Sequence, residues 1–175
     1  MLLRALTHRS WCAENPGYLS NERLEYLGDS VLGVIVTDEV FHRFPDAGEG
    51  RMSRARAAVV CAPALAEMAA EIDLGAALLL GKGEASSGGR DRPSILADGM
   101  EAVIGAVYLD AGLPAARKLV LGLLADRLVD ADGQDAKSRL HELVARGHDN
   151  QISYEISEAG PEHDKQFRAV LYLNG

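Results

Sequence analysis

The chain of 175 residues is long enough to bury the core of one domain and to add a small second one. A hydrophobic content of 47% and a charged content of 25% are those of a soluble globular protein and exclude a largely disordered chain. The formal net charge of −8, taken alone, argues against a nucleic-acid partner. That argument weakens if the acids bind divalent cations, because bound metal neutralises part of their charge.

The sequence has the features of a cytoplasmic protein. Its longest apolar stretch, residues 95–109, contains two acids and is shorter than the roughly 20 residues that span a membrane, so we expect no membrane-spanning segment. The start, MLLRALTHRS, lacks the pattern of a secretory signal. Two cysteines, Cys12 and Cys61, make no metal-ligand or disulfide framework, which favours a reducing, cytoplasmic location.

Helical periodicity extends over the first 130 or so residues, interrupted by Gly and Pro. Apolar residues recur at helical spacing from about residue 21 to the Phe44–Pro45 pair, and a second helix is predicted from about residue 52 to 71. The glycine-rich segment GKGEASSGGRDRP is predicted to be a loop. It leads into a helix that begins near Ser94, and Pro114 opens a further helix.

The last 40 or so residues follow a different pattern. The segment KSRLHELVARG predicts one helix, and alternating stretches around Ile152–Ile156 and Phe167–Leu173 predict two strands joined by the turn-rich EAGPEHD. We therefore expect an α+β module that stops after its second strand, with a bare sheet edge.

The segment NERLEYLGDSVL gathers acids on one face of its predicted helix. Glu22, Glu25 and Asp29 fall within an arc of roughly 60° on a helical wheel, and apolar residues occupy the other side. Like charges at these spacings destabilise a helix by a few tenths of a kcal/mol per pair. From this helix alone, a solvated acidic face and a metal site explain the pattern equally well.

The predicted helix ILADGMEAVIGAVYL favours the metal site. Its only charged residues, Asp98 and Glu101, share one face and are expected to be partly buried, where a carboxylate needs a cation. Lysine or arginine would serve, but paired acids on two helices suit Mg²⁺, which takes oxygen ligands. Glu25, Asp29, Asp98 and Glu101 would hold two ions about 3.5 to 4 Å apart, an arrangement that cleaves phosphodiesters.

Several motifs resemble those of the ribonuclease III family of double-stranded RNA endonucleases. NERLEYLGDS is similar to the family's nine-residue signature. Family-like segments occur in the expected order: ALTHRS at 5–10, HRFPDAGEG at 42–50 and SILADGMEAVIGAVYLD at 94–110. The tail from KSRLHEL to HDKQFRAVL resembles the first half of a double-stranded-RNA-binding domain. The resemblance covers almost the whole chain.

The resemblance implies a fold class and a domain organisation. Residues 1–131 are expected to form an all-α endonuclease domain, a ribonuclease III-like helical bundle that begins within the family's first helical stretch and lacks a leading helix. Residues 132–136 would be a linker, and residues 137–175 the N-terminal part of a truncated α+β double-stranded-RNA-binding domain. The helix that carries the family's RNA-gripping lysines is expected to be absent from this sequence.

The resemblance also implies an activity. It implies a cytoplasmic homodimer with two Mg²⁺ ions per active site, replaceable by Mn²⁺, that leaves 5′-phosphate and 3′-hydroxyl ends in ribosomal RNA and other RNA processing. The positions that match the family's functional residues are the metal ligands Glu25, Asp29, Asp98 and Glu101, of which Asp29 and Glu101 are catalytic, the further acids of the cleft Glu22 and Glu49, and the interface aromatic Tyr26.

Basic residues near these motifs are candidate RNA contacts. Arg51 and Arg54 lie beside the EG pair that follows HRFP, where RNA contact and surface ion pairing are equally good explanations. Lys82 lies in the glycine-rich segment, where small residues permit close approach of phosphate, although a solvated loop is the simpler explanation. Lys137 and Arg139 lie on the helix that touches the RNA minor groove in the family.

Two alternatives to the nuclease stay open from the sequence. One is a non-catalytic dimeric RNA-binding protein of the same fold, against which the complete set of acids argues. The other is an all-helical nucleotide pyrophosphatase, which also uses Mg²⁺ on helix-borne acids. The choice between RNA and nucleoside triphosphates as substrate separates the two enzymes.

Overall fold

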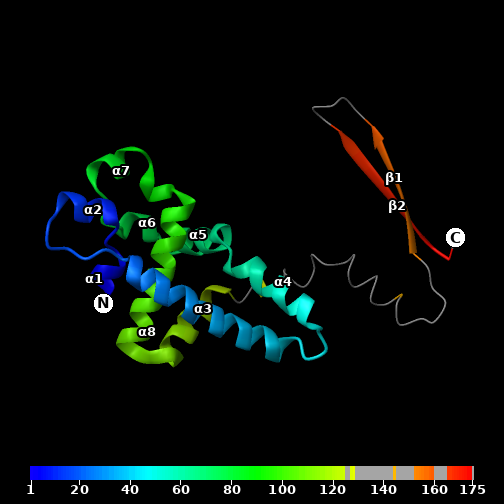
Figure 1. Ribbon diagram of the computed structural model, residues 1–175, viewed down its shortest axis with the longest axis horizontal. Coiled ribbons are helices and arrows are strands. Elements are labelled where there is room, and N and C mark those ends of the chain that lie inside the picture. Colours follow the sequence, from blue (N-terminus) through cyan, green and yellow to red (C-terminus); the bar gives the residue numbers. More distant parts are fainter. Residues whose placement is uncertain (125–126, 129–143, 145–151, 160–164, 175) are drawn as a thin grey trace. The chain divides into compact units, whose positions relative to one another are not determined.

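The computed structural model describes residues 1–124, 127–128, 144, 152–159 and 165–174. The chain divides into two compact units, Met1–Asp132 and Gly133–Gly175. In the first unit the described elements are helices, and in the second they form a two-stranded antiparallel sheet (Figure 1). The predicted order, an all-α unit followed by a strand-containing tail, is confirmed.

The helices of the first unit follow one another with short connections. In the described part of this unit they are α1 (Leu2–Ala5), α2 (Arg9–Glu14), α3 (Glu22–Arg43), α4 (Glu49–Val60), α5 (Ala62–Glu71), α6 (Leu74–Ala77), α7 (Lys82–Ser86), the 3₁₀ helix η1 (Gly89–Asp91) and α8 (Pro93–Leu124). No helix in the described ranges is long and apolar enough to cross a membrane.

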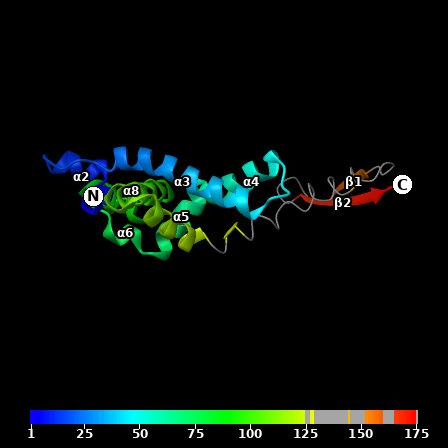
Figure 2. The same cartoon turned by 90° about the horizontal axis from the view of Figure 1, so that it is seen from below.

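Helix α8 is the central element of the helical unit. It packs against both α3 and α5, and Figure 2 shows α3 along one side of the unit with α8 beneath it. Leu32 and Ile35 of α3, Leu65 of α5, and Met100 and Ile104 of α8 are fully buried in this core. The apolar spacing that predicted these helices therefore matches the faces that are buried.

Helices α3 and α8 touch through their backbones. A Cβ added to Gly28 would lie 1.8 Å from the carbonyl oxygen of Glu101, and one added to Gly105 would lie 2.3 Å from the carbonyl oxygen of Leu24. Only glycine fits at either position. Because Glu25 lies one helical turn before Gly28, this crossing brings the acids of α3 close to those of α8.

The first segment of the chain is tied to the segment before α7. Thr7 and Leu79 form an isolated parallel bridge. The backbone N–H of His8 donates to the Leu79 carbonyl at 3.1 Å, and the N–H of Leu79 donates to the Leu6 carbonyl at 2.8 Å. The backbone N–H of Asn21 also donates to the Thr7 carbonyl, at 2.9 Å, so the start of α3 is joined to the same bridge.

Some predicted element boundaries were wrong. The helix predicted from residue 52 to 71 is two helices, α4 and α5, because Cys61 takes an extended conformation (φ −72°, ψ 153°) before the proline in the first turn of α5. The segment predicted to be a glycine-rich loop contains α7 and η1. Near the predicted break at Pro114, α8 is interrupted at Gly112 (φ 79°, ψ 176°), a conformation that favours glycine.

The second unit contains the two predicted strands. β1 (Ile152–Ala159) and β2 (Gln166–Leu173) pair antiparallel, with Ile152 opposite Leu173 and Ala159 opposite Gln166. Both strand predictions are confirmed, although β1 continues three residues beyond the predicted Ile156. The predicted linker at 132–136 lies outside the described residues, as does the helix predicted after it, apart from Val144.

Candidate metal centre

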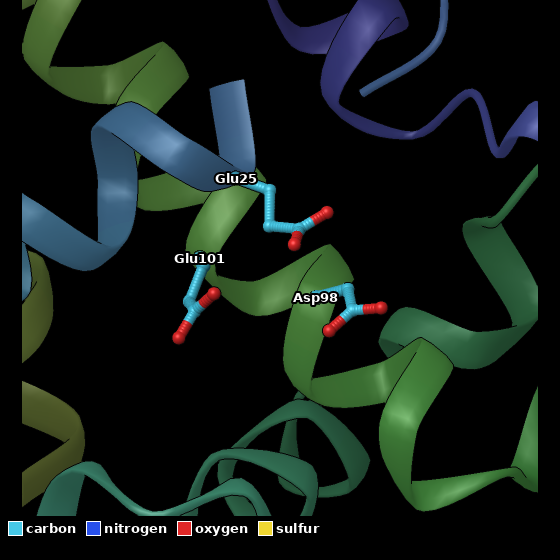
Figure 3. A group of neighbouring side chains, drawn as sticks. All are labelled: Glu25, Asp98 and Glu101. Carbon is cyan, nitrogen blue, oxygen red and sulfur yellow. The ribbon is translucent and has the colours of Figure 1, made fainter. Parts of the chain in front are cut away.

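Acids that are far apart in the sequence meet where α3 crosses α8. Glu25 comes from the first turn of α3, and Asp98 and Glu101 come from one face of α8 (Figure 3). One carboxylate oxygen from each of the three lies within 4.8 Å of the others. We call these three residues the acidic group.

The carboxylates of the acidic group are partly buried and repel one another. Burial raises the pKa of Glu101 to about 7, and the charges of Asp29, Glu25 and Asp98 add to this effect. Burial also raises the pKa of Glu25 and of Asp98, while the nearby Arg9 partly offsets the increase in both. Such a group is stabilised by a bound cation, which removes the repulsion between its members.

The donor set of the acidic group fits a hard divalent cation. All three ligating side chains offer carboxylate oxygen, which suits Mg²⁺ and Mn²⁺, whereas Zn²⁺ sites usually include histidine or cysteine. Mg²⁺ needs only a few carboxylates because it keeps several waters. The acidic group could therefore hold this ion through Glu25, Asp98 and Glu101.

Asp29 and Glu22 flank the acidic group. Asp29 is exposed and does not belong to the three, but it is close enough for its charge to raise the pKa of Glu101. Glu22 lines a pocket together with Glu25 and Asp98. The hydroxyl of Ser20 donates to Glu22 at 2.7 Å.

Glu49 lies apart from the acidic group within a single chain. It begins α4, accepts a hydrogen bond from the hydroxyl of Ser53 at 2.9 Å, and lines a pocket with Thr37 and Phe41 from the later half of α3. Glu25 occupies the first turn of α3, so the two acids lie at opposite ends of that helix. The structure of one chain thus brings Glu22, but not Glu49, to the side of the group.

Tyr26 belongs to an exposed apolar stripe on α3. Its side chain is 80% exposed, and Val34 and Phe41 on the same helix are 60% and 62% exposed. Their spacing of eight and seven residues places all three on one helical face. We call these residues the α3 stripe.

The candidate RNA contacts are scattered over the helical unit. Lys82 is exposed at the start of α7, and Arg54 is exposed on α4. Arg51 is half-buried, with its guanidinium 5.6 Å from the ring centre of Phe44. Lys137 and Arg139 lie outside the described residues.

Two residues that shape the site were missed from the sequence. Gly28 and Gly105 allow the helices to approach, and the available signal was a glycine within one turn of an acid in each apolar helix.

His8 borders the candidate metal centre. Its Nδ1 accepts the backbone N–H of Ser10 at 3.2 Å and so caps α2. Burial lowers the pKa of His8, which favours its neutral form.

Comparisons with known proteins identify the family. The model of the Ribonuclease-III-like family matches residues 1–128. A protein named Ribonuclease 3 from Nocardia farcinica is 52% identical over 182 residues, which cover 100% of this chain and 76% of the relative. Another Ribonuclease 3, from Streptomyces coelicolor, is 49% identical over 180 residues, which cover 100% of this chain and 65% of the relative. The chain belongs to the ribonuclease III family.

Solved structures of ribonuclease III share the fold of the helical unit. The nuclease domain of ribonuclease III from Campylobacter jejuni matches with a TM-score of 0.66 and 41% identity, over 72% of this chain and 83% of that one. A second structure of that domain, described as flexible in a region involved in dimer formation, matches with a TM-score of 0.67 and 42% identity, over 71% and 85%. The predicted fold class and the predicted membership of this family of endoribonucleases are confirmed.

Proposed function

We propose that this chain is a homodimeric, Mg²⁺-dependent endonuclease that cleaves double-stranded RNA in ribosomal RNA and other RNA processing. The observation that carries the proposal is the meeting of Glu25, Asp98 and Glu101 from two helices of a ribonuclease III fold. The name Ribonuclease 3, shared by relatives about half identical to this chain, supports RNA as the substrate.

The acids of the site have different roles. Glu25, Asp29, Asp98 and Glu101 would hold two Mg²⁺ ions, which Mn²⁺ could replace. When bound, these ions would activate a water for attack and neutralise charge on the phosphate. Asp29 and Glu101 are the catalytic pair. This assignment is supported by the charge of Asp29, which contributes to the raised pKa of the Glu101 carboxyl. Hydrolysis breaks the bond from phosphorus to the 3′-oxygen and leaves 5′-phosphate and 3′-hydroxyl ends. Glu22 adds charge at the cleft, and the resemblance assigns the same role to Glu49.

The α3 stripe forms the centre of the homodimer. Three large apolar side chains exposed on one helical face are typical of a surface that packs against another copy, and two-fold packing would pair α3 with its partner. The C. jejuni nuclease domain, described as having a region involved in dimer formation, supports this assignment. Tyr26 is the interface aromatic.

The remaining assignments concern RNA binding and organisation. We assign residues 1–131 to the endonuclease domain, 132–136 to a linker and 137–175 to part of a double-stranded-RNA-binding domain, supported by the division of the chain into units at residues 132 and 133. Arg51, Arg54, Lys82, Lys137 and Arg139 are the RNA contacts. Free cysteines at positions 12 and 61 support a reducing, cytoplasmic setting.

The test is cleavage of a labelled RNA duplex by the wild-type chain and by Glu101→Gln. We expect the variant to lose at least about a hundredfold in rate, because it loses a metal ligand and a charge at the reacting phosphate. Glu67→Gln, which changes an exposed glutamate on α5 in the same way, is the matched control and should cleave normally.

Three outcomes would contradict the proposal. Full activity of Glu101→Gln would rule out the four-acid site. A wild-type chain that binds the duplex but leaves it intact would favour the non-catalytic dimeric RNA-binding protein. Consumption of nucleoside triphosphates in place of RNA would favour a pyrophosphatase.

A further inference from the structure

A pocket of about 290 Å³ adjoins the acidic group and extends away from it. Glu25 and Asp98 line one part of it, so the pocket is continuous with the candidate metal centre. Its lining also includes Arg9, Arg92 and Asn21, whose side chains suit an anion or a hydrogen-bonding ligand rather than a metal. We call this space the side pocket.

Asn21 is the unusual residue of the side pocket. It is only 3% exposed and lines the pocket, and its side chain makes no capping hydrogen bond to the first turn of α3. An asparagine that precedes a helix normally accepts a backbone N–H of the first turn. The amide of Asn21 is therefore available to a ligand that enters the side pocket.

Arg9 supplies positive charge next to the acidic group. Its side chain is 74% exposed, with its guanidinium 3.9 Å from the carboxylate of Glu22. Burial raises the pKa of both Glu25 and Asp98, and the charge of Arg9 partly offsets this increase, so Arg9 lies near both carboxylates. An exposed arginine held by one long contact can bind a phosphate at little cost.

Arg92 and the start of α8 supply the remaining positive character. The guanidinium of Arg92 pairs with Glu84 and lies 3.2 Å from the hydroxyl of Ser87, which fixes it at the edge of the side pocket. Ser94 and Ile95, in the first turn of α8, also line the pocket. The first turn of a long helix carries N–H groups without helical partners and favours anions.

We infer that the side pocket binds a backbone phosphate of the RNA strand next to the cleaved bond, with Asn21 and Arg9 as the phosphate-binding residues. The inference rests on the proposed function and names two further residues for the same reaction. Glu22 and Glu84 also face the pocket, but each lies beside an arginine. A cation that neutralises Glu25 and Asp98 removes the net negative charge of the pocket. The two arginines then balance Glu22 and Glu84, so the pocket no longer repels a phosphate.

The first test measures binding without cleavage. Each variant is made in the 175-residue chain that also carries Glu101→Gln, and its dissociation constant for an RNA duplex is measured in Mg²⁺. We expect Arg9→Ala to weaken binding roughly tenfold and Asn21→Ala roughly fivefold, as for the loss of one hydrogen bond to a charged group. Arg43→Ala, which removes the same charge at the far end of α3, is the matched control and should change binding less than about twofold.

The second test locates the phosphate. The two phosphates that flank the cleavage point are replaced, one at a time, by neutral methylphosphonates. At one of these positions the modified duplex should bind Arg9→Ala and its parent equally well, because the contact is already lost. If the effect of Arg9→Ala persists undiminished at both positions, the inference is wrong.

Further controls separate a binding role from a structural one. Because the Asn21 side chain does not cap α3, we expect Asn21→Ala to melt within a few degrees of its parent. Weakened binding with unchanged melting supports the inference. If Asn21→Ala does not fold, the amide has a structural role and Asn21 is no longer assigned to phosphate binding. The binding of RNA by Arg9→Ala then decides whether the inference holds. Normal binding by Arg9→Ala together with cleavage by the wild-type chain overturns this inference alone, whereas absence of cleavage by the wild-type chain overturns the proposed function.

Discussion

Helix α3 has two faces, one packed against α8 within the chain and one exposed to solvent. One face carries Glu25 and places Gly28 against α8, so that its acid meets Asp98 and Glu101 within a single chain. The other face carries the α3 stripe, which is exposed to solvent along the helix. The acidic face is thus formed by internal packing, whereas the apolar face would be covered only by another surface.

The largest expected effect follows from breaking the contact on the acidic face. In Gly28→Ala the added Cβ would meet the Glu101 carbonyl oxygen at 1.8 Å, so α3 and α8 must separate. We expect the free energy of unfolding to fall by about 3 kcal/mol, measured by urea denaturation, with a loss of Mg²⁺ affinity. Gly33→Ala on the same helix is the control, since its nearest neighbour would be 4.0 Å away. Equal stability of Gly28→Ala and wild type would show that the crossing is not tight.

The apolar face is broken by Phe41→Asp. This side chain is 62% exposed, so the substitution should leave the fold intact while placing a charge in the proposed interface. We expect the dimer dissociation constant to rise at least about a hundredfold, measured by sedimentation equilibrium. Ile72→Asp, at an exposed site after α5, should leave the dimer unchanged. A Phe41→Asp variant that dimerises normally would move the interface elsewhere.

The pH dependence of stability sharpens the description of the acidic face. In the folded chain without metal, the pKa of Glu101 is raised from 4.5 to about 7, so the folded state holds this proton more tightly than the unfolded state. The resulting stabilisation is complete below pH 4.5 and is lost as the pH rises to about 7. In chelator, the melting temperature should therefore fall between pH 5.5 and 8, and it should fall less in Glu101→Gln. Identical pH profiles for the two chains would argue against a raised pKa of Glu101.

Two valines of α3 allow a direct comparison of its packed face with its exposed face. Val31 is 7% exposed and Val34 is 60% exposed, on the same helix and three residues apart. We expect Val31→Ala to lower the free energy of unfolding by about 1 to 2 kcal/mol and Val34→Ala to change it by less than about 0.5 kcal/mol. Val34→Ala should instead weaken the dimer a few-fold. Equal destabilisation in the two variants would remove the distinction between the faces.

The sequence predicted the features that depend on local spacing. The interval of three residues between Asp98 and Glu101 placed them on one face of a helix, and the apolar spacing around Leu32 predicted α3 almost to its observed bounds. The break at Cys61 was missed because alanine-rich sequence on both sides favours helix. The available signal was Pro63, which is typical of the first turn of a helix and unfavourable inside one.

Features that depend on distance in space could not be read from the sequence. The resemblance assigned Glu49 to the same cleft as Glu25, yet the length of α3 separates these acids within one chain. The contact of Gly28 with α8 depends on how two helices cross, which residue spacing does not specify. For the same reason the side pocket, whose residues come from distant segments such as Arg9 and Arg92, was not anticipated.

The bridge between Thr7 and Leu79 has a consequence for the order in which the enzyme becomes competent. It closes a long loop, and the entropy lost in such closure must be recovered by contacts that form at the same time. His8 and Arg9 directly follow Thr7, and Leu79 precedes the segment that leads to α8. Because Glu25 precedes Asp98 and Glu101 in the sequence, α3 leaves the ribosome during synthesis well before the acids of α8. We expect RNA cleavage to begin only after residue 101 has emerged and this loop has closed.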